Sequence, residues 1–420
     1  MANRYALELE DPRTRLSASN TTPDGGYGWV NVGVCFSING FTWGAVSSYG
    51  VYLAHYLEDD VYPEASPLDF AVIGGLNFSM AMLVAPLVTI VARIYGPRLP
   101  MLFGVIFETA GFIGASFSQR IWQLYICQGV LVGFGVGFIY VPSTAILSQW
   151  FTAKRSLANG ISTAGSGIGG IMFSFAAGAL IHSVSVSWAL RVMGIITGVM
   201  NLAATLLIRH RNEIVQPPQK GFDMDLLRRY DVLLLLAWSS ISTLGYITLL
   251  FSLPDFARSI DLSKAQAAAI AAFLSLGTAI GRPFIGVISD RFGRIEVAGM
   301  LTFACGISVF AIWLPATSYG VTVFYAIING AILGVFWVTV GPLSVEVGGL
   351  AQLPSLLSLS WISVILPAAF SEVIALKLRR PESSRAYLYP QIFAGVAYIL
   401  ASLCLFQLRR VIRRRSLQRC

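Results

Sequence analysis

The stretch GRPFIGVISDRFGR, residues 281–294, is the most informative part of this sequence for its fold. It joins an apolar run to a short charged turn, and Pro283 precedes Gly293 by ten positions. The same spacing separates Pro86 from Gly96 at the end of an apolar run in the first half of the chain. This repetition indicates that the chain consists of two similar halves.

A second pair of segments repeats in the same way. Residues 125–142 contain a tyrosine, a Gly-x-x-x-Gly pair and a proline, and residues 325–342 contain the same three features. The distance from the tyrosine to the proline is 17 positions in both segments. Membrane proteins with two such halves can rock one half against the other around a central site. The pattern is typical of transporters.

The composition is that of a protein that lies mostly in a membrane. Of the 420 residues, 55% are hydrophobic and only 12% are charged, whereas soluble domains are about one-quarter charged. Runs of about 20 apolar residues are long enough to cross a bilayer as helices. Twelve such runs occur, at 30–54, 70–91, 99–117, 121–140, 157–181, 188–208, 232–253, 265–288, 297–314, 321–340, 353–376 and 387–408. The sequence therefore predicts an all-α membrane protein with twelve transmembrane helices in two six-helix pseudo-repeat bundles.

The same runs divide the chain into five parts. In chain order we expect a tail, a six-helix bundle, a central loop, a second six-helix bundle and a basic tail, at residues 1–28, 29–208, 209–231, 232–408 and 409–420. Because residues 1–23 are polar and lack an apolar stretch, we expect no cleavable signal peptide.

Basic residues predict the orientation. Twenty of the 29 Lys and Arg residues fall in the tails, the central loop and the short loops on the same side. Since cytosolic loops are rich in Lys and Arg, we expect both termini in the cytosol and a multi-pass protein of the plasma membrane. The net charge of +8 comes mostly from residues 409–419. A basic tail beside a membrane binds anionic lipid, so the lipid bilayer is the expected partner of this charge and no nucleic acid is expected.

Catalysis and cofactor binding find no support in the sequence. The three histidines are not spaced as metal ligands, and no nucleophile stands with a base. Gly165-x-Gly167-x-x-Gly170 lacks the strand-turn-helix context of a nucleotide site. We therefore expect no enzyme activity, no metal, no cofactor and no obligate protein partner. Without a nucleotide site, a proton gradient is the expected source of energy.

Arg282 is the leading candidate for a substrate-binding residue. It lies in the middle of the eighth apolar run, between Gly281 and Pro283. An ionisable group at this depth is costly and indicates function. A guanidinium keeps its proton and offers a planar fork that suits a carboxylate. The alternative is a structural pairing with Glu372 or with the carbonyl end of a helix.

Two acidic residues inside apolar runs are candidates for proton coupling. Glu372 follows Pro367, which frees a backbone carbonyl and can break a helix beside a cavity. It is either a protonatable coupling site or the counter-ion of Arg282. Glu108 lies in the third run, where structural hydrogen bonding is the alternative.

Several polar or amphipathic residues inside the runs are candidates to line a central cavity. Hydrogen bonding within the core explains each of them equally well. They are Asn39, Tyr49, Asn77, Asn329, Trp337 and Trp361.

The charged turn at 290–294 is a candidate gate. Asp290 stands at the end of the eighth run, where it can pair with an arginine of the turn and receive the N-terminus of a neighbouring helix. Gly286 would let another helix approach closely. The expected gating residues of the second half are Gly286, Asp290, Arg291, Gly293 and Arg294. Arg93, Gly96 and Arg98 form the equivalent turn of the first half, which lacks the acidic residue and is expected to latch more weakly.

Three segments resemble motifs of a known family. Pro23-Asp24-Gly25-Gly26-Tyr27-Gly28-Trp29-Val30 resembles the first signature of the monocarboxylate transporter family, and residues 150–169 resemble its second. The turn Asp290-Arg291-Phe292-Gly293-Arg294 is similar to the loop motif of the major facilitator superfamily, to which that family belongs. Residues 209–231 and 367–380 look like its fungal branch. The resemblance implies the major facilitator fold, with alternating access through a central cavity.

The resemblance also implies roles for single residues. In proton-coupled members an arginine of the eighth helix binds the substrate anion, an aspartate one turn earlier takes the proton, and a lysine of the first helix assists. Arg282 matches the arginine, whereas Thr278 and Ser47 stand at the other two positions. Proton symport of a lactate-like acid by the usual residues is therefore not expected, and a larger organic solute is favoured.

Together these observations predict a secondary active transporter of a small organic solute that is anionic or rich in carbonyl groups. Efflux of a secondary metabolite and proton-coupled uptake of a monocarboxylate or vitamin-like acid both remain open. A transporter-like nutrient sensor is a further alternative, although such sensors usually carry long cytosolic extensions and the tails here are short.

Overall fold

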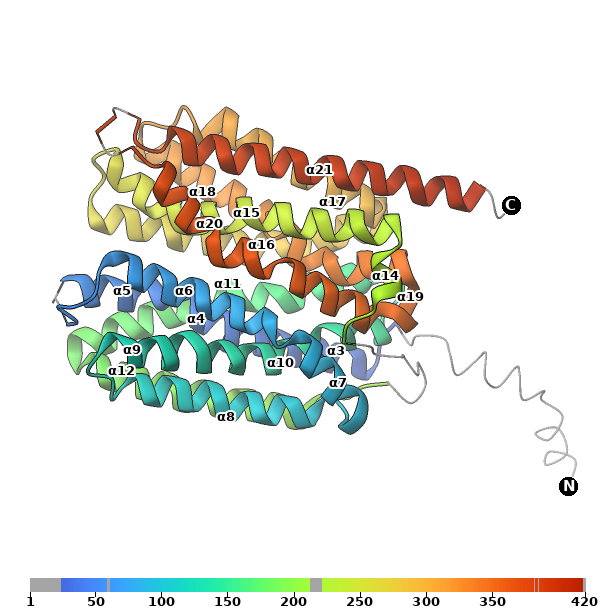
Figure 1. The fold of residues 1–420 in the computed structure, drawn as a ribbon, viewed down its shortest axis with the longest axis horizontal. Coiled ribbons are helices and arrows are strands. Elements are labelled where there is room, and N and C mark those ends of the chain that lie inside the picture. Colours follow the sequence, from blue (N-terminus) through green and yellow to red (C-terminus); the bar gives the residue numbers. More distant parts are fainter. Residues whose placement is uncertain (1–23, 59–60, 212–220, 381, 384, 418–420) are drawn as a thin grey trace, which may run out of the picture.

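The computed structural model describes residues 24–58, 61–211, 221–380, 382–383 and 385–417. Within these ranges the chain is helical and contains no strand. The parts of the predicted tails and central loop at 1–23, 212–220 and 418–420 lie outside the described residues. The long helices run side by side along one direction (Figure 1). The prediction of an all-α fold is confirmed.

Six passes make up the first half of the molecule. The first, second and fourth passes are each built from more than one segment, including the π-helical stretches η1 and η2. The elements are α3 (Tyr27–Asn39), η1 (Gly40–Gly44), α4 (Ala45–Ser47), α5 (Tyr49–Glu58), α6 (Pro67–Leu83), α7 (Ala85–Tyr95), α8 (Arg98–Ala115), α9 (Ile121–Leu124), η2 (Tyr125–Leu131), α10 (Val132–Trp150), α11 (Arg155–Ser183) and α12 (Val186–Leu207).

Six further passes follow a short helix in the central segment. The elements are α14 (Met224–Leu227), α15 (Tyr230–Ser259), α16 (Lys264–Phe292), α17 (Arg294–Ser308), η3 (Val309–Trp313), α18 (Tyr319–Leu333), α19 (Val335–Ser363), α20 (Ile365–Leu378) and α21 (Leu388–Leu417). Gly349 has a φ of 75° inside α19, a conformation that glycine adopts without strain. It separates the tenth pass from the eleventh.

The predicted number of passes agrees with the helices. Among the described residues, ten helices are long and apolar enough to cross a membrane, by length and composition. One of these covers Tyr319–Leu378 and contains two passes, because it is broken at Gly349. The interrupted helix at 27–58 supplies one more. The described chain therefore forms the predicted twelve-helix membrane protein.

Both halves place corresponding ends on the same side. In Figure 1 the first half lies below the second, and the start of α3, the end of α21 and the short helix α14 all lie at the right. We call this side of the bundle the tail end and the opposite side the far end. The two halves meet along a seam that runs from one end to the other.

Glycine allows the two halves to approach closely at the seam. Gly160 of α11 lies against the carbonyl oxygen of Arg282 in α16, and Gly286 of α16 lies against the backbone of Ser156 and Leu157. In lipid, small residues of this kind let helices pack backbone to backbone. A second pair, α6 and α20, closes the seam nearer the far end, where Ser79 Oγ donates to the Ile365 carbonyl oxygen at 3.3 Å.

Substituting a seam glycine tests this packing. In Gly160→Ala the added methyl group would overlap the carbonyl oxygen of Arg282, and overpacking of this kind costs about 1–3 kcal/mol. We expect a lower apparent melting temperature of the purified protein in detergent. The matched control is Gly33→Ala in α3, where a Cβ meets no atom within 4 Å. Equal melting temperatures for the two variants would show that the α11–α16 contact is not tightly packed.

Candidate functional site

Arg282 lies buried at the seam, with 5% of its surface exposed. Its Nη1 donates across the seam to the Thr163 carbonyl oxygen at 2.5 Å and to Ser166 Oγ at 2.6 Å, both in α11. Its Nε has no hydrogen-bond partner among the described residues. Within that part of the chain the cation is bonded by neutral groups, and no salt bridge to it is found.

A small cavity lies next to these contacts. Thr163, which accepts from Arg282, lines it together with Asn39, Asn159 and Ser162 of the first half. Tyr140 and Trp337 line its other walls, as do Ser143, Thr144, Leu147, Val340 and Gly341. Its volume is about 10 Å³, close to the minimum that holds one water molecule. The two halves are therefore closed around this centre.

Aromatic side chains from both halves meet beside the cavity. We call Trp43, Phe78 and Tyr140 of the first half and Tyr246, Trp337 and Trp361 of the second the aromatic cluster. Across the seam, the ring of Trp337 lies 6.0 Å from that of Trp43 and 5.9 Å from that of Phe78. Tyr140 and Trp361 are 5.7 Å apart. Within the second half, Trp337 and Trp361 stack at 5.8 Å with an interplanar angle of 17°.

The structure brings together some of the predicted cavity residues and not others. Asn39 lines the cavity and donates to Ser162 Oγ at 3.2 Å, and Trp361 belongs to the aromatic cluster. The hydroxyl of Tyr49 donates instead to the Phe70 carbonyl oxygen at 3.0 Å. Asn329 donates to the hydroxyl of Tyr325 inside the second half, at 2.5 Å. All three side chains therefore make hydrogen bonds within one half, as the alternative explanation expects, and of the three Asn39 also lines the cavity.

The two acidic candidates lie inside separate halves and away from Arg282. Glu372 of α20 accepts from Ser252 Oγ of α15 at 3.3 Å. Glu108 of α8 is fully buried and accepts from Asn201 Nδ2 of α12 at 2.8 Å. The alternative in which Glu372 is the counter-ion of Arg282 is not seen in this conformation. In the described ranges no group of three His, Cys, Asp or Glu side chains is placed to hold a metal ion.

Asp290 joins the halves at the tail end. Its carboxylate accepts from the backbone N–H groups of Ser156 at 3.0 Å and Leu157 at 2.9 Å, in the first turn of α11. A carboxylate at a helix N-terminus also interacts favourably with the helix dipole. Arg294 donates to the Thr152 carbonyl oxygen at 2.7 Å and forms an ion pair with Asp290 at 3.2 Å. We call these contacts the tail-end latch.

The corresponding turn of the first half has a similar backbone, but among the described residues no hydrogen bond or ion pair of Arg93, Gly96 or Arg98 crosses the seam. Gly96 and Gly293 end α7 and α16 with φ values of 82° and 102°. Arg98 donates to the Ile208 carbonyl oxygen at 3.0 Å, within the first half, and Arg93 is exposed. Arg291, also exposed, lies over the ring of Phe292 at 5.5 Å and does not join the tail-end latch.

Two further contacts at the tail end were not predicted from the sequence. Asp24 Oδ1 accepts from the N–H groups of Thr152 at 2.7 Å and Ala153 at 3.0 Å, so Asp24 holds the same turn that Arg294 binds. Ser358 of the second half donates to the Gly221 carbonyl oxygen at 2.6 Å. Asp24 stood in a signature segment, whereas Gly221 and Ser358 carried no signal, because neither is charged or part of a repeated pattern.

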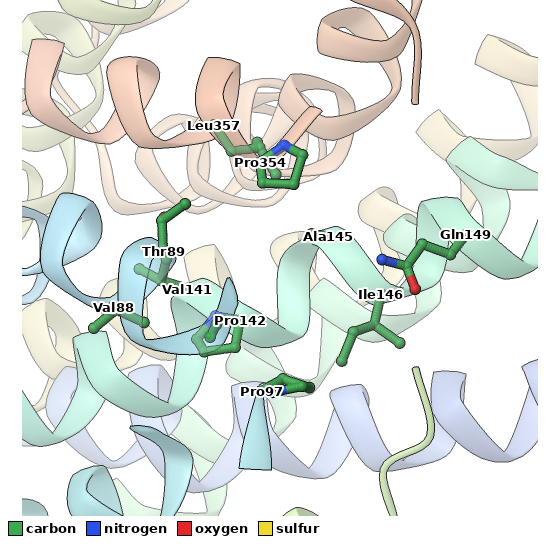
Figure 2. Close-up of a pocket in the computed structure, with 11 residues that line it drawn as sticks. Val88, Thr89, Pro97, Val141, Pro142, Ala145, Ile146, Gln149, Pro354 and Leu357 are labelled. Carbon is green, nitrogen blue, oxygen red and sulfur yellow. The ribbon is translucent and has the colours of Figure 1, made fainter. Parts of the chain in front are cut away.

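A second cavity lies between the halves toward the tail end. Figure 2 shows Pro354 and Leu357 of α19 on one side and Val141, Pro142 and Gln149 of α10 on the other. Its volume is about 30 Å³ and its walls are mostly apolar. A cavity of this volume holds a few water molecules but not an organic solute. The seam is therefore also closed toward the tail end.

Known proteins are similar to this chain in sequence and in fold. The sequence matches the Major Facilitator Superfamily over residues 32–360. Over 95% of its length the chain is 36% identical to the "Probable transporter MCH2" of Saccharomyces cerevisiae, of which it covers 86%. It is 28% identical to the "Fujikurins efflux protein" of Gibberella fujikuroi, over 97% of this chain and 89% of that protein.

The solved structure of XylE, a proton:xylose symporter, shares the fold with a TM-score of 0.75. The comparison covers 91% of this chain and 95% of XylE at 13% sequence identity, so it bears on the fold alone. The matches are to a family of transporters and not of enzymes. The chain therefore belongs to the Major Facilitator Superfamily and is a multi-pass membrane transporter.

Proposed function

We propose that this transporter moves a small organic solute whose anionic or carbonyl group binds Arg282. The observation that carries the proposal is the neutral surrounding of this buried cation. Removing a charge from water is costly unless an opposite charge compensates it. Thr163 and Ser166 supply acceptors but no charge. A solute with a carboxylate or another acceptor-rich group would complete the site.

The finer assignment is to the monocarboxylate transporter family, in its fungal branch. Support for the family comes from the two signature segments, and the similarity to a probable transporter of yeast agrees with the fungal branch. Efflux of a secondary metabolite is the preferred direction, because relatives include the Fujikurins efflux protein and the "Agnestins efflux protein AgnL12" of Paecilomyces divaricatus. Uptake of a monocarboxylate would use the same site.

The site would open alternately to the two sides of the plasma membrane. We place the tail end in the cytosol, because most Lys and Arg residues fall in the tails and loops of this side and cytosolic loops are rich in them. The tail-end latch then closes the cytosolic side and must break when the halves rock apart there. Gly286 and Gly293 would support the close approach and the turn that this latch needs.

A proton is the proposed coupling ion, with Glu372 as its site. Glu372 lies within the second half with Ser252 as its neighbour, so its charge is not fixed by an ion pair with Arg282. A carboxylate in such a setting can take up and release a proton as its access to water changes. Glu108 is the second candidate and would serve in the same way within the first half.

The role of Arg282 is tested by Arg282→Lys. The cargo is first identified by comparing metabolites in the medium and inside cells with and without the gene. Lysine keeps the charge but loses the planar fork, so we expect transport of that cargo to fall at least about tenfold. Arg191→Lys is the control, because Arg191 binds Ser116 Oγ at 3.1 Å within the first half. Unchanged transport by folded Arg282→Lys protein would exclude the proposed site.

Proton coupling is tested by Glu372→Gln and Glu108→Gln in parallel. Glutamine keeps the hydrogen bond but cannot carry a charge. If Glu372 is the site, transport by Glu372→Gln should no longer respond to the pH gradient, whereas Glu108→Gln should respond like the unmodified protein. Transport is measured in proteoliposomes with and without an imposed gradient. If transport by both variants responds normally to the pH gradient, neither residue is the proton-coupling site.

The tail-end latch is tested by Asp290→Asn. Because the amide lacks the charge that binds the start of α11 and Arg294, we expect the tail end to open more often. The readout is the labelling rate of Thr144→Cys, at the cavity, by a membrane-impermeant thiol reagent from the tail side. It should rise several-fold. Arg291→Gln, in the same turn, should leave the rate unchanged, and equal rates in both variants would rule out a latch.

A further inference from the structure

We infer that the solute carries a flat conjugated ring next to its acidic or carbonyl group, and that Trp337 selects for this ring. The inference rests on the proposed function and adds the class of the substrate. It is carried by the aromatic cluster, which adjoins the contacts of Arg282 at the cavity that Tyr140 and Trp337 line.

The aromatic cluster forms two walls that face each other across the seam. Trp43, Phe78 and Tyr140 belong to the first half, and the facing rings of Trp337 and Trp361 belong to the second. Pairs within one half, such as Trp337 with Trp361 at 5.8 Å, stay together when the halves move as bodies. The pairs across the seam are the ones that separation breaks.

A ligand that enters between the walls must replace these ring contacts. Aromatic pairs are more favourable than the buried area alone explains, because the edge of one ring is attracted to the face of another. A planar conjugated ring can restore such contacts with both walls. A saturated group of the same size fills the volume but offers no π face, so it binds more weakly.

Unpaired polar atoms near the walls indicate which groups the ring of the solute carries. Trp43 Nε1, Trp361 Nε1 and Arg282 Nε are buried and have no hydrogen-bond partner among the described residues. All three are donors and cannot accept. Because they can only donate, the complementary ligand is a ring that carries acceptors, such as a carboxylate, ketone or phenolate oxygen. The three donors come from three different passes, so the acceptors would lie at several positions on the ring.

The ring site and the acid site lie close together. Tyr140 and Trp337 line the same small cavity as Thr163, the acceptor of the Arg282 hydrogen bond. An aryl carboxylate could therefore present its acid to Arg282 while its ring lies against Trp337. A short aliphatic acid could reach Arg282 but would leave the two walls without a partner.

The test compares two acids of similar size. Cinnamate is planar and conjugated, and 3-cyclohexylpropionate carries the same acid on a saturated ring. Binding of each to the purified full chain is measured by isothermal titration calorimetry. We expect cinnamate to bind about tenfold more tightly. Trp337→Leu should remove most of this preference by weakening cinnamate alone, and Trp337→Phe should keep it.

Trp313→Leu is the matched control. Trp313 is a buried tryptophan that stacks on Tyr325 at 5.7 Å inside the second half, so its loss should leave the ratio of the two affinities unchanged. Equal binding of both acids by the unmodified protein, or binding of neither, overturns the inference, and this result does not depend on any variant folding. Failure of the proposed function is distinct, because it appears as normal cargo transport by Arg282→Lys.

Discussion

The close approach of α11 and α16 holds the two halves together and positions both Arg282 and Asp290. Lipid gives helices no hydrophobic reason to associate, so they are held by packing and by polar contacts that small residues make possible. Gly160 brings the backbone of α11 to the carbonyl oxygen of Arg282. At this distance Arg282 reaches Thr163 and Asp290 reaches the first turn of α11. A bulkier residue at the seam would remove both contacts together.

The buried charged residues fall into two groups, those at the seam between the halves and those inside one half. Arg282 and Asp290 stand at the seam, where each accepts or donates hydrogen bonds across to the other half, and Asp290 also pairs with Arg294 of its own half. Glu108 and Glu372 are bonded within their own halves, by Asn201 and Ser252. Rocking of the halves would leave the pairs inside each half intact and change the surroundings of the seam cation. In the proposed mechanism the solute therefore binds at the seam, and the proton binds to a carboxylate inside one half.

Much of the fold follows from the sequence, because the cost of exposing polar backbone to lipid makes a long apolar run a helix. The same cost singled out Arg282, which lies at the seam. What the sequence could not supply is the direction in which a side chain points. Tyr49 and Asn329 were as plausible as Asn39, yet Asn39 lines the cavity and the other two do not, although all three make hydrogen bonds within one half. Trp337 and Trp361 of the aromatic cluster were among the predicted cavity residues. The other four members were not, because aromatic residues occur in every apolar run and only the packing of six passes brings these together.

Arg282 and Asp290 lie two turns apart on α16, and both bind α11, so the solute site and the tail-end latch act on one helix pair. A hydrogen bond to a charged group contributes about 1.5–3 kcal/mol. Arg282 and Asp290 each make two such bonds to α11. If the solute takes over the Arg282 guanidinium, α11 loses two of these four bonds. A loss of about 3 kcal/mol changes the ratio of two conformations by more than about a hundredfold. The solute can therefore weaken the tail-end latch without contacting Asp290. It does so because it binds the Arg282 guanidinium more tightly in the open state, where Thr163 and Ser166 no longer compete for it.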